Sequence, residues 1–418
     1  MKFQNFDVFG GLLGFIVALF LAVIFSWSGA FGFKSMGCGW FFFDGVSFFL
    51  TLLTFFLFLS LYFFFDYSSY LPMLMILLSL FSSVGSYCCN HALLFWGFYE
   101  MSMVPLLFLL VLESPYSERY VASWYLLGYV VFTSLPMVLC IFYVSLGYGT
   151  FNMGLWFLSK GCGVGVFFIL AILFITKMPL APFHSWLPMV HAEATSSVSV
   201  CLSGYMMKLG VLGVYRFCSF LLPGSIFSKV YMCVALIFSV LFFFSACREL
   251  DGKRWLAFMS LSHIMISCMC LGVASQEGYG LAFLYCLGHG LSAGVMFLFL
   301  WAMYEISGSR NWSILKWGVN SGFVRCLMGA SLCTVASLPP TAQFFCEVFM
   351  LLEAGEVGLI YIFLLCLYLF FGGLVPLFLL GGLLTRHFSI GLGGGYIFVT
   401  LGSVSVLLIW SFMLFLAS

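Results

Sequence analysis

A few ionisable side chains lie deep inside long apolar segments of this sequence. They are two glutamates, two lysines and two histidines: Glu100, Lys177, Lys208, His263, His289 and Glu347. A charge at the centre of a bilayer costs at least ~2.5–3.5 kcal/mol, even on the most lenient scale of membrane insertion. We therefore expect the six groups to face one another, or water, inside a helical bundle rather than lipid.

The chemistry of these six groups suits proton transfer. Burial can lower the pKa of a lysine and raise that of a glutamate until both approach neutrality. Histidine titrates near neutral pH without any perturbation. Rows of such groups inside a membrane are typical of the proton relays of pumps and transporters. We predict that these six side chains form a proton relay.

Each of these residues, taken alone, also has a structural explanation. A glutamate or lysine can form an ion pair that only holds two helices together, and a histidine can be a hydrogen-bonded packing residue. Structural pairing needs two groups and not six on separate segments, so the whole set favours a relay.

His184 and His191 follow Lys177 at steps of seven, but prolines interrupt this segment. We expect a structural or gating role for these two histidines.

The composition indicates that lipid is the solvent of this chain. Of its 418 residues, 64% are hydrophobic and only 7% are charged, whereas a soluble domain carries about 25% charged residues. The net charge of +1, with no basic cluster, argues against nucleic acid as a partner. The 16 cysteines form no C-x-x-C pair. We therefore expect no metal, iron–sulfur centre or other redox cofactor in this chain.

Apolar segments of about 20 residues, the length that crosses the hydrocarbon core, recur along the whole chain. They predict an all-α polytopic membrane protein of about 13 transmembrane helices in a single membrane domain. The expected spans are 8–27, 40–65, 69–87, 90–112, 120–146, 166–187, 193–218, 228–247, 254–274, 277–303, 318–352, 358–384 and 393–417.

The loops between these spans carry unequal charge. If the spans alternate in direction, one side collects eight lysines and arginines, and the other collects three, with Arg216 near its edge. Positive charge marks the compartment of synthesis, so we expect the N-terminus on that side and the C-terminus on the other. Glu118, Arg119 and the charged residues of 248–254 lie at span ends, where we expect them to be solvated.

Two of the expected spans are interrupted by prolines, in KMPLAP (177–182) and in SLPPT (337–341). Proline removes a backbone hydrogen bond, and the freed carbonyls must face a cavity or other protein. The breaks fall five spans apart, which predicts two inverted five-helix repeats, a pattern of transporters. We expect N-terminal helices at 1–68, a first repeat at 69–219, a second at 228–384 and a C-terminal helix at 385–418.

Several blocks, in this order along the chain, resemble the subunit 4 family of NADH dehydrogenase. The similarity runs from about residue 90 to 352, with Met189 and Thr195 in place of a lysine and a proline that the family commonly has. The blocks are FWGFYEMSMVPL (95–106), KMPLAPFHSWLPMVHAEATSSVSVCLSGYMMKLGVLGVYRF (177–217), ELDGKRWLAFMSLSHI (249–264), GHGLSAGVMF (288–297) and LPPTAQFFCEVF (338–349).

The resemblance assigns roles to the same six residues. It implies an input ion pair of Glu100 and Lys177, followed by a central lysine at Lys208. The relay then continues through two histidines to a terminal glutamate, which are His263, His289 and Glu347.

The resemblance also implies an activity and a location. The chain is expected to be an antiporter-like, proton-translocating membrane subunit of NADH:ubiquinone oxidoreductase, respiratory complex I, in the mitochondrial inner membrane. NADH, FMN, iron–sulfur clusters and ubiquinone then belong to partner subunits, while neighbouring antiporter-like membrane subunits and lipids surround this chain. The N-terminus would face the matrix and the C-terminus the intermembrane space. A redox-independent cation/proton antiporter of the same fold is the alternative.

Overall fold

The computed structural model describes residues 36–64, 70–156, 163–222, 226–273, 278–318, 321–385 and 396–417. Over these ranges the chain is predominantly helical, and nine of the described helices are long and apolar enough to cross a membrane. The protein is thus a polytopic helical membrane protein. The expected first span, 8–27, lies outside the described residues.

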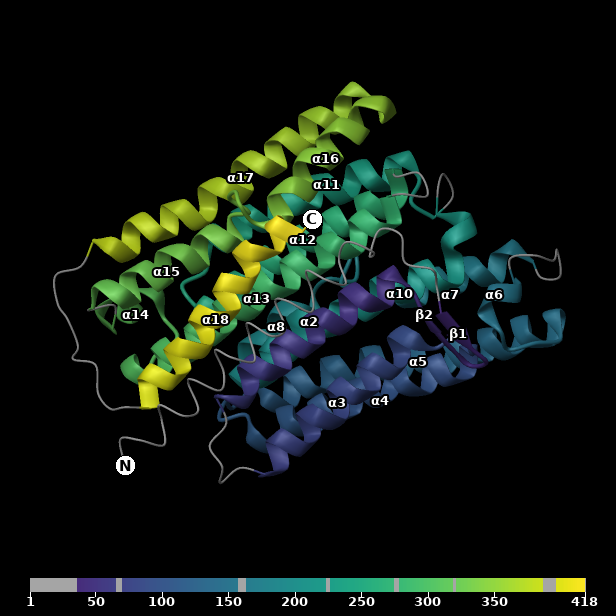
Figure 1. Cartoon of the computed structure of the whole chain (residues 1–418), viewed down its shortest axis with the longest axis horizontal. Coiled ribbons are helices and arrows are strands. Elements are labelled where there is room, and N and C mark those ends of the chain that lie inside the picture. The colour runs from purple at the N-terminus through teal and green to yellow at the C-terminus, as the bar shows by residue number, and fades with distance from the viewer. Residues whose placement is uncertain are drawn as a thin grey trace.

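The long helices lie side by side in one bundle (Figure 1). The helices are α2 (Gly45–Tyr62), α3 (Tyr70–Cys88), α4 (Ala92–Glu113), α5 (Arg119–Tyr148), α6 (Met153–Trp156), α7 (Val164–Lys177), α8 (Trp186–Glu193), α9 (Ser196–Cys201), η2 (Leu202–Met206), α10 (Met207–Cys218), η3 (Ser219–Leu221), α11 (Lys229–Arg248), α12 (Gly252–Val273), α13 (Gly278–Ser307), α14 (Trp312–Gly318), α15 (Gly322–Val335), α16 (Ala342–Val357), α17 (Leu359–Leu384) and α18 (Tyr396–Ala417).

The predominantly helical chain also contains one short β-hairpin among its described residues. A short antiparallel hairpin of β1 (Met36–Cys38) and β2 (Phe41–Phe43) precedes α2, with Met36 opposite Phe43. The expected span 40–65 therefore begins as a helix only at Gly45. Asp44 caps this helix, because its carboxylate accepts a hydrogen bond from the Ser47 amide at 2.9 Å and the Ser47 hydroxyl accepts one from the Asp44 amide.

The two spans that the sequence predicts to be interrupted by prolines are both broken, whereas Pro105, Pro136 and Pro376 lie inside continuous helices. The first consists of α7, which ends at Lys177, and α8, which begins at Trp186. The second consists of α15, which ends at Val335, and α16, which begins at Ala342. The span after the first break is also irregular, because α9 passes into the π-helix η2 before α10 begins. The π-helix η2 and residues 178–181 of the first break are buried, where other protein groups can satisfy their backbone, whereas Pro182, Pro339 and Pro340 are exposed.

Three spans form the centre of the bundle: the segment from α9 to α10, α12 and α13. Figure 1 shows α13 running through the middle, and it packs against α2, α12, α15, α16 and α18. By contrast, α5 and α17 lie at the outside and expose apolar side chains such as Leu146 and Phe378, as expected for surfaces that face lipid or another subunit. The central spans therefore determine where Lys208, His263 and His289 lie.

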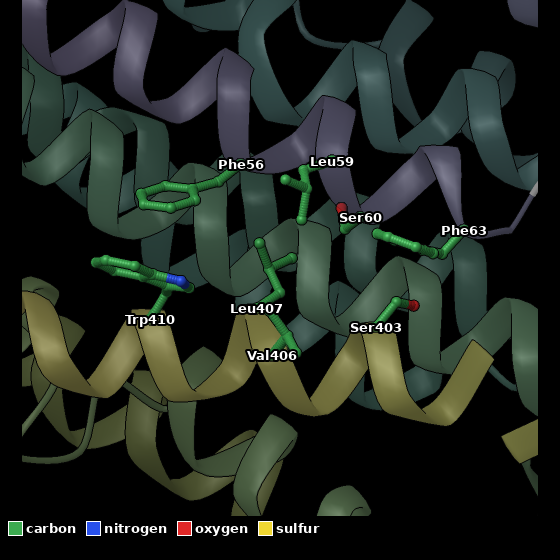
Figure 2. Close-up of a pocket in the computed structure, with 8 residues that line it drawn as sticks. All are labelled: Phe56, Leu59, Ser60, Phe63, Ser403, Val406, Leu407 and Trp410. Atoms are coloured by element: carbon green, nitrogen blue, oxygen red, sulfur yellow. The ribbon is translucent and has the colours of Figure 1, made fainter. Parts of the chain in front are cut away.

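Figure 2 shows a small pocket between α2 and α18. The rings of Phe56 and Trp410 lie 4.5 Å apart at one end of it, and Ser60 and Ser403 lie at the other end. The hydroxyls of both serines donate to carbonyls of their own helices. The cavity measures about 10 Å³, room for no more than one water molecule. This contact serves to pack α18 against the bundle.

Candidate functional site

The first broken helix carries a closed ion pair. Lys177, the last residue of α7, places its Nζ 2.6 Å from Oε1 of Glu100 on α4, and its side chain is only 2% exposed. The Nζ also lies 4.2 Å from the centroid of the Tyr99 ring, a cation–π contact. The break frees the Thr176 carbonyl, which accepts a hydrogen bond from the Trp186 indole at 3.2 Å. A cation here is also favoured by the negative end of the α7 dipole.

Lys208 lies alone in the centre of the bundle. It is completely buried, and its Nζ donates a hydrogen bond to the carbonyl of Ser203 in the π-helix η2. Single π-helical turns are frequent at functional sites, since they redirect backbone carbonyls. Among the described residues no carboxylate lies within 4.0 Å of Lys208, so it has no ion-pair partner there.

Two glycines bring the Lys208 helix against the first break. A Cβ at Gly210 would lie 2.4 Å from Cγ of Met178, and one at Gly213 would lie 2.3 Å from the Phe174 ring. Met178 follows Lys177 directly, and α10 packs along α7. Only glycine allows this approach, which holds the helix that carries Lys208 against the helix that ends at Lys177.

The two histidines of the predicted relay are neighbours. His263 on α12 and His289 on α13 have ring centroids 5.4 Å apart, and both are 2% exposed. Both lie within range of electrostatic interaction with Lys208. The glycines around His289 pack closely: a Cβ at Gly290 would lie 2.6 Å from Leu53, and one at Gly294 would lie 2.5 Å from Leu57.

Glu347 on α16 lies in a cage of hydroxyl groups beside the second break, which we call the Glu347 cage. The Ser337 hydroxyl donates to Oε2 at 2.6 Å, and the hydroxyls of Tyr285 and Tyr368 each donate to Oε1 at 3.2 Å. Nδ1 of His263 lies 2.6 Å from the Tyr368 hydroxyl and 4.0 Å from Oε1 of Glu347. The two tyrosines therefore bridge the histidine and the carboxyl group.

The structure thus brings the predicted residues together in three groups. The Glu100–Lys177 pair is one, Lys208 is the second, and the two histidines with Glu347 are the third. Among the described residues, no hydrogen bond joins Lys177 to Lys208 or Lys208 to His289. A proton that passes between these groups would need water or side-chain movement.

Three residues of the cage were not predicted from the sequence: Tyr285, Tyr368 and Ser337. Tyr285 precedes His289 by four residues on one helix, so the two share a helix face. That spacing was a usable signal. Tyr368 lies in an otherwise apolar segment with no such neighbour, and only the fold brings it to Glu347.

His184 and His191 do not share a helix face. His184 lies in the turn between α7 and α8, with its ring 4.8 Å from that of Phe242. His191 lies in α8, is completely buried, and stacks on Phe297 of α13 at 5.1 Å. The structural or gating role expected for both histidines stays a prediction.

One expected loop charge is buried, which corrects the prediction that the charges of 248–254 are solvated. Lys253 is 5% exposed, because α12 begins at Gly252 and packs against α8, and its Nζ donates to the carbonyl of Ala194 at 2.8 Å.

Arg216 forms an ion pair: its guanidinium binds both carboxylate oxygens of Asp44, each at 2.8 Å. Burial alone would raise the pKa of the Asp44 carboxyl, but Arg216 and Ser47 hold it below its ordinary value.

Among the described residues, no group of three His, Cys, Asp or Glu side chains is arranged as ligands of a metal ion. The expectation that the chain holds no cofactor stays a prediction.

Residues 89–372 match the model of the family described as NADH:quinone oxidoreductase/Mrp antiporter, transmembrane. A relative named NADH-ubiquinone oxidoreductase chain 4, from Ceratitis capitata, is 31% identical over 66% of this chain and 62% of its own length. One of the same name from Ascaris suum is 27% identical, over 62% of each chain. The chain therefore matches less than two thirds of the length of these relatives.

Solved structures share the fold. A chain of respiratory complex I from Thermus thermophilus superposes with a TM-score of 0.78 at 22% identity, covering 89% of this chain and 82% of that one. A chain of the Mrp complex from Dietzia sp. superposes with a TM-score of 0.72 at 17% identity, covering 93% and 76%. Since the family match covers more than half of the sequence, this chain belongs to the NADH:quinone oxidoreductase/Mrp antiporter transmembrane family.

Proposed function

We propose that this chain is a proton-translocating core membrane subunit of NADH:ubiquinone oxidoreductase, which couples electron transfer in partner subunits to proton pumping across the mitochondrial inner membrane. One observation carries the proposal. Buried ionisable groups extend from the ion pair at the first broken helix, through Lys208 and two histidines, to Glu347 at the second. A structural ion pair would need only the first of these groups.

In the proposed mechanism the ion pair is the input switch. While Glu100 holds Lys177 at 2.6 Å, the ammonium is compensated. Separation of the two side chains leaves the charge of Lys177 uncompensated in a low-dielectric site, which favours proton release from it and proton rearrangement at Lys208. The histidines pass the proton on, and the Glu347 cage accepts it, because its hydroxyls can orient towards either protonation state of the carboxyl.

The energies involved are compatible with pumping. Moving one charge against about 150–200 mV requires roughly 3.5–4.6 kcal/mol. A change of about three in the pKa of one group corresponds to about 4 kcal/mol. A pKa change of that size in one buried group is therefore enough to drive one proton, provided that access alternates between the two sides.

The same proposal includes the surroundings of the chain. NADH, FMN, iron–sulfur clusters and ubiquinone would be bound by partner subunits, and neighbouring antiporter-like subunits would transmit the conformational or electrostatic signal laterally. We further propose about 13 transmembrane helices with two inverted repeats, at 69–219 and 228–384, flanked by segments 1–68 and 385–418. The N-terminus would face the matrix and the C-terminus the intermembrane space.

A cation/proton antiporter without redox coupling is the second candidate. The likeness to a chain of the Mrp complex supports it, because that fold is shared over 93% of this chain. Both candidates use the same relay, and they differ in the assembly that holds the chain.

A native gel of the source membranes, stained for NADH oxidation, separates the two candidates. The active band is excised and its proteins are sequenced. Peptides of this chain in the band that oxidises NADH are the expected result. Finding the chain only in a band without NADH activity would overturn the complex I proposal in favour of the antiporter.

A further inference from the structure

A polar cluster holds the end of α8, the second half of the first broken helix. The carbonyls of three consecutive residues, 192–194, accept hydrogen bonds from the guanidinium of Arg310, the hydroxyl of Ser114 and the ammonium of Lys253 respectively. These donors come from three separate parts of the chain. We call this group the α8 clamp.

Lys253 is the unusual member of the clamp. Its Nζ lies 2.8 Å from the Ala194 carbonyl and 5.7 Å from the Tyr116 ring. The nearby carboxylate of Asp251 pairs instead with Arg310, at 3.4 Å. In the described part of the chain, no carboxylate oxygen lies within 4.0 Å of the Lys253 ammonium. The direct contacts of this ammonium are a helix C-terminus and an aromatic ring, both of which favour a positive charge.

Lys253 lies between the loop surface and the interior of the bundle. On the outer side, Tyr116 is only half-buried, and Arg310, which is 22% exposed, lies 3.9 Å over its ring. Glu193 lies close enough to Lys253 to interact with it electrostatically, as do Asp251 and Arg310. A short distance therefore separates this buried lysine from charged groups at the loop surface.

His191 lies on the inner side of the clamp. It precedes Ala194 by three residues, is completely buried, and stacks on Phe297. Neither of its ring nitrogens has a hydrogen-bond partner among the described residues. The titratable groups that interact with it electrostatically are Lys253 on one hand and Lys208 on the other. The His191 imidazole therefore lies within range of electrostatic interaction with both Lys253 and Lys208.

We propose that Lys253 and His191 form a branch of the proton path that connects the loop surface at Tyr116 and Arg310 with Lys208. The proposal rests on the proposed function of the relay. Lys253 would release a proton to the free nitrogen of His191, directly or through water, and would regain one from the loop surface. His191 would then give its other N–H proton to neutral Lys208. Each transfer breaks one N–H bond and forms another.

The competing explanation is purely mechanical, with Lys253 only holding α8 in place. Substitution of Lys253 by arginine distinguishes the mechanical explanation from the proton path. Arginine keeps the positive charge and the hydrogen-bond donors of the clamp but does not release a proton in proteins. A mechanical clamp tolerates Lys253→Arg, whereas a proton carrier does not. His191→Gln is an independent test, because this residue makes no hydrogen bond in the clamp.

The experiment measures protons moved per NADH oxidised by the complete assembly in sealed proteoliposomes. The variants are Lys253→Arg and His191→Gln, with Lys316→Arg as the matched control on α14 and Lys208→Met as the reference for a disabled relay. Native gels check assembly, and NADH oxidation with an uncoupler checks electron transfer. We expect both test variants to fall to the yield of Lys208→Met, while Lys316→Arg keeps the parent yield.

The branch would be overturned, and the relay left intact, if Lys208→Met is disabled but either Lys253→Arg or His191→Gln keeps the parent yield of protons per NADH oxidised. Full yield in Lys208→Met would instead overturn the proposed function itself. If Lys253→Arg does not assemble, His191→Gln alone decides. The dependence of the rate on pH at the loop side is a further readout, and it should change in Lys253→Arg, whereas a mechanical role predicts the parent profile.

Discussion

The two broken helices stabilise their buried charges in different ways. At the first break, Lys177 is paired with a carboxylate from another helix, at 2.6 Å. At the second, Glu347 has no cation within hydrogen-bond distance among the described residues, and the nearest base, His263, lies 4.0 Å away. Three hydroxyl groups surround Glu347 instead.

This difference determines how each break can respond. An ion pair between two helices depends strongly on their separation, because the attraction acts in a low-dielectric site. Hydroxyl groups donate or accept as required, so a caged carboxyl can be charged or neutral without a change of structure. The first break is therefore suited to receive a conformational signal, and the second to store and release a proton.

The largest expected effect is at the first break. Glu100→Gln removes the carboxylate but leaves a side chain of the same shape, and we expect NADH-driven pumping to be abolished. Assembly should be preserved, because Lys177 can lose its proton once its counter-charge is gone. Dye-monitored acidification and a native gel measure the two quantities. Glu118→Gln, at the surface end of α5, is the control. Normal pumping in Glu100→Gln would remove this residue from the relay.

At the second break, substitutions of Glu347 should affect proton release and the free energy of unfolding to different extents. Glu347→Gln should block proton release, while the amide still bonds to the surrounding hydroxyls, so the free energy of unfolding should fall by less than about 1 kcal/mol. Glu347→Leu leaves hydroxyls unpaired and should cost roughly 1–3 kcal/mol. Thermal unfolding in detergent compares the two variants. Equal destabilisation by Gln and Leu would show that the cage requires a carboxylate.

A smaller effect is expected from a single hydroxyl of the cage. Tyr285→Phe removes one of the donors to Glu347, while Tyr368 and Ser337 remain. One hydrogen bond contributes about 0.5–1.5 kcal/mol, so the pumping rate should fall by roughly twofold to tenfold. Initial rates of acidification at saturating NADH provide the measurement. A complete loss would mean that Tyr285 itself carries the proton from His263.

The smallest effect concerns an ion pair outside both breaks. Asp44 and Arg216 are partly exposed, 17% and 12% respectively, and Asp44→Asn should lower the free energy of unfolding by about 1 kcal/mol. The pKa of Asp44 is lower in the folded protein than its ordinary value of 3.8. The pair therefore stabilises the fold fully above pH 3.8, and this contribution is lost as the pH falls through the lower, folded value.

Thermal unfolding of the parent and of Asp44→Asn between pH 3 and pH 7 tests this prediction. The difference between the two should be constant near neutrality and should shrink below pH 3.8. A difference that grows on acidification would contradict the assigned direction of the pKa.

Much of the fold follows from the sequence. From 40–65 onwards, each expected span overlaps at least one described helix, and the span 193–218 consists of α9, η2 and α10. Runs of apolar residues and prolines suffice for this, because the bilayer sets the helix length and proline disrupts the backbone. The hairpin before Gly45 was missed, since its aromatic strand continues the apolar run of α2 without a change in composition.

The site could be predicted only in part. The six buried ionisable residues stand out because charge in an apolar segment is costly. Their partners do not stand out: tyrosine is ordinary in such segments, and only tertiary packing brings Tyr368 to Glu347. Lys253 was misjudged for the opposite reason. It lies among other charges at a span end, where sequence position indicates solvent, yet α12 carries it under the end of α8.

The most direct test of the relay is Lys208→Met in the complete assembly. Methionine replaces all of the lysine side chain except the terminal ammonium, and removing a cation that has no carboxylate partner among the described residues leaves no opposite charge unpaired. Protons moved per NADH oxidised are measured in sealed proteoliposomes, with electron transfer checked in the presence of an uncoupler. A relay through Lys208 predicts a lower proton yield at normal uncoupled NADH oxidation. An unchanged proton yield would contradict it.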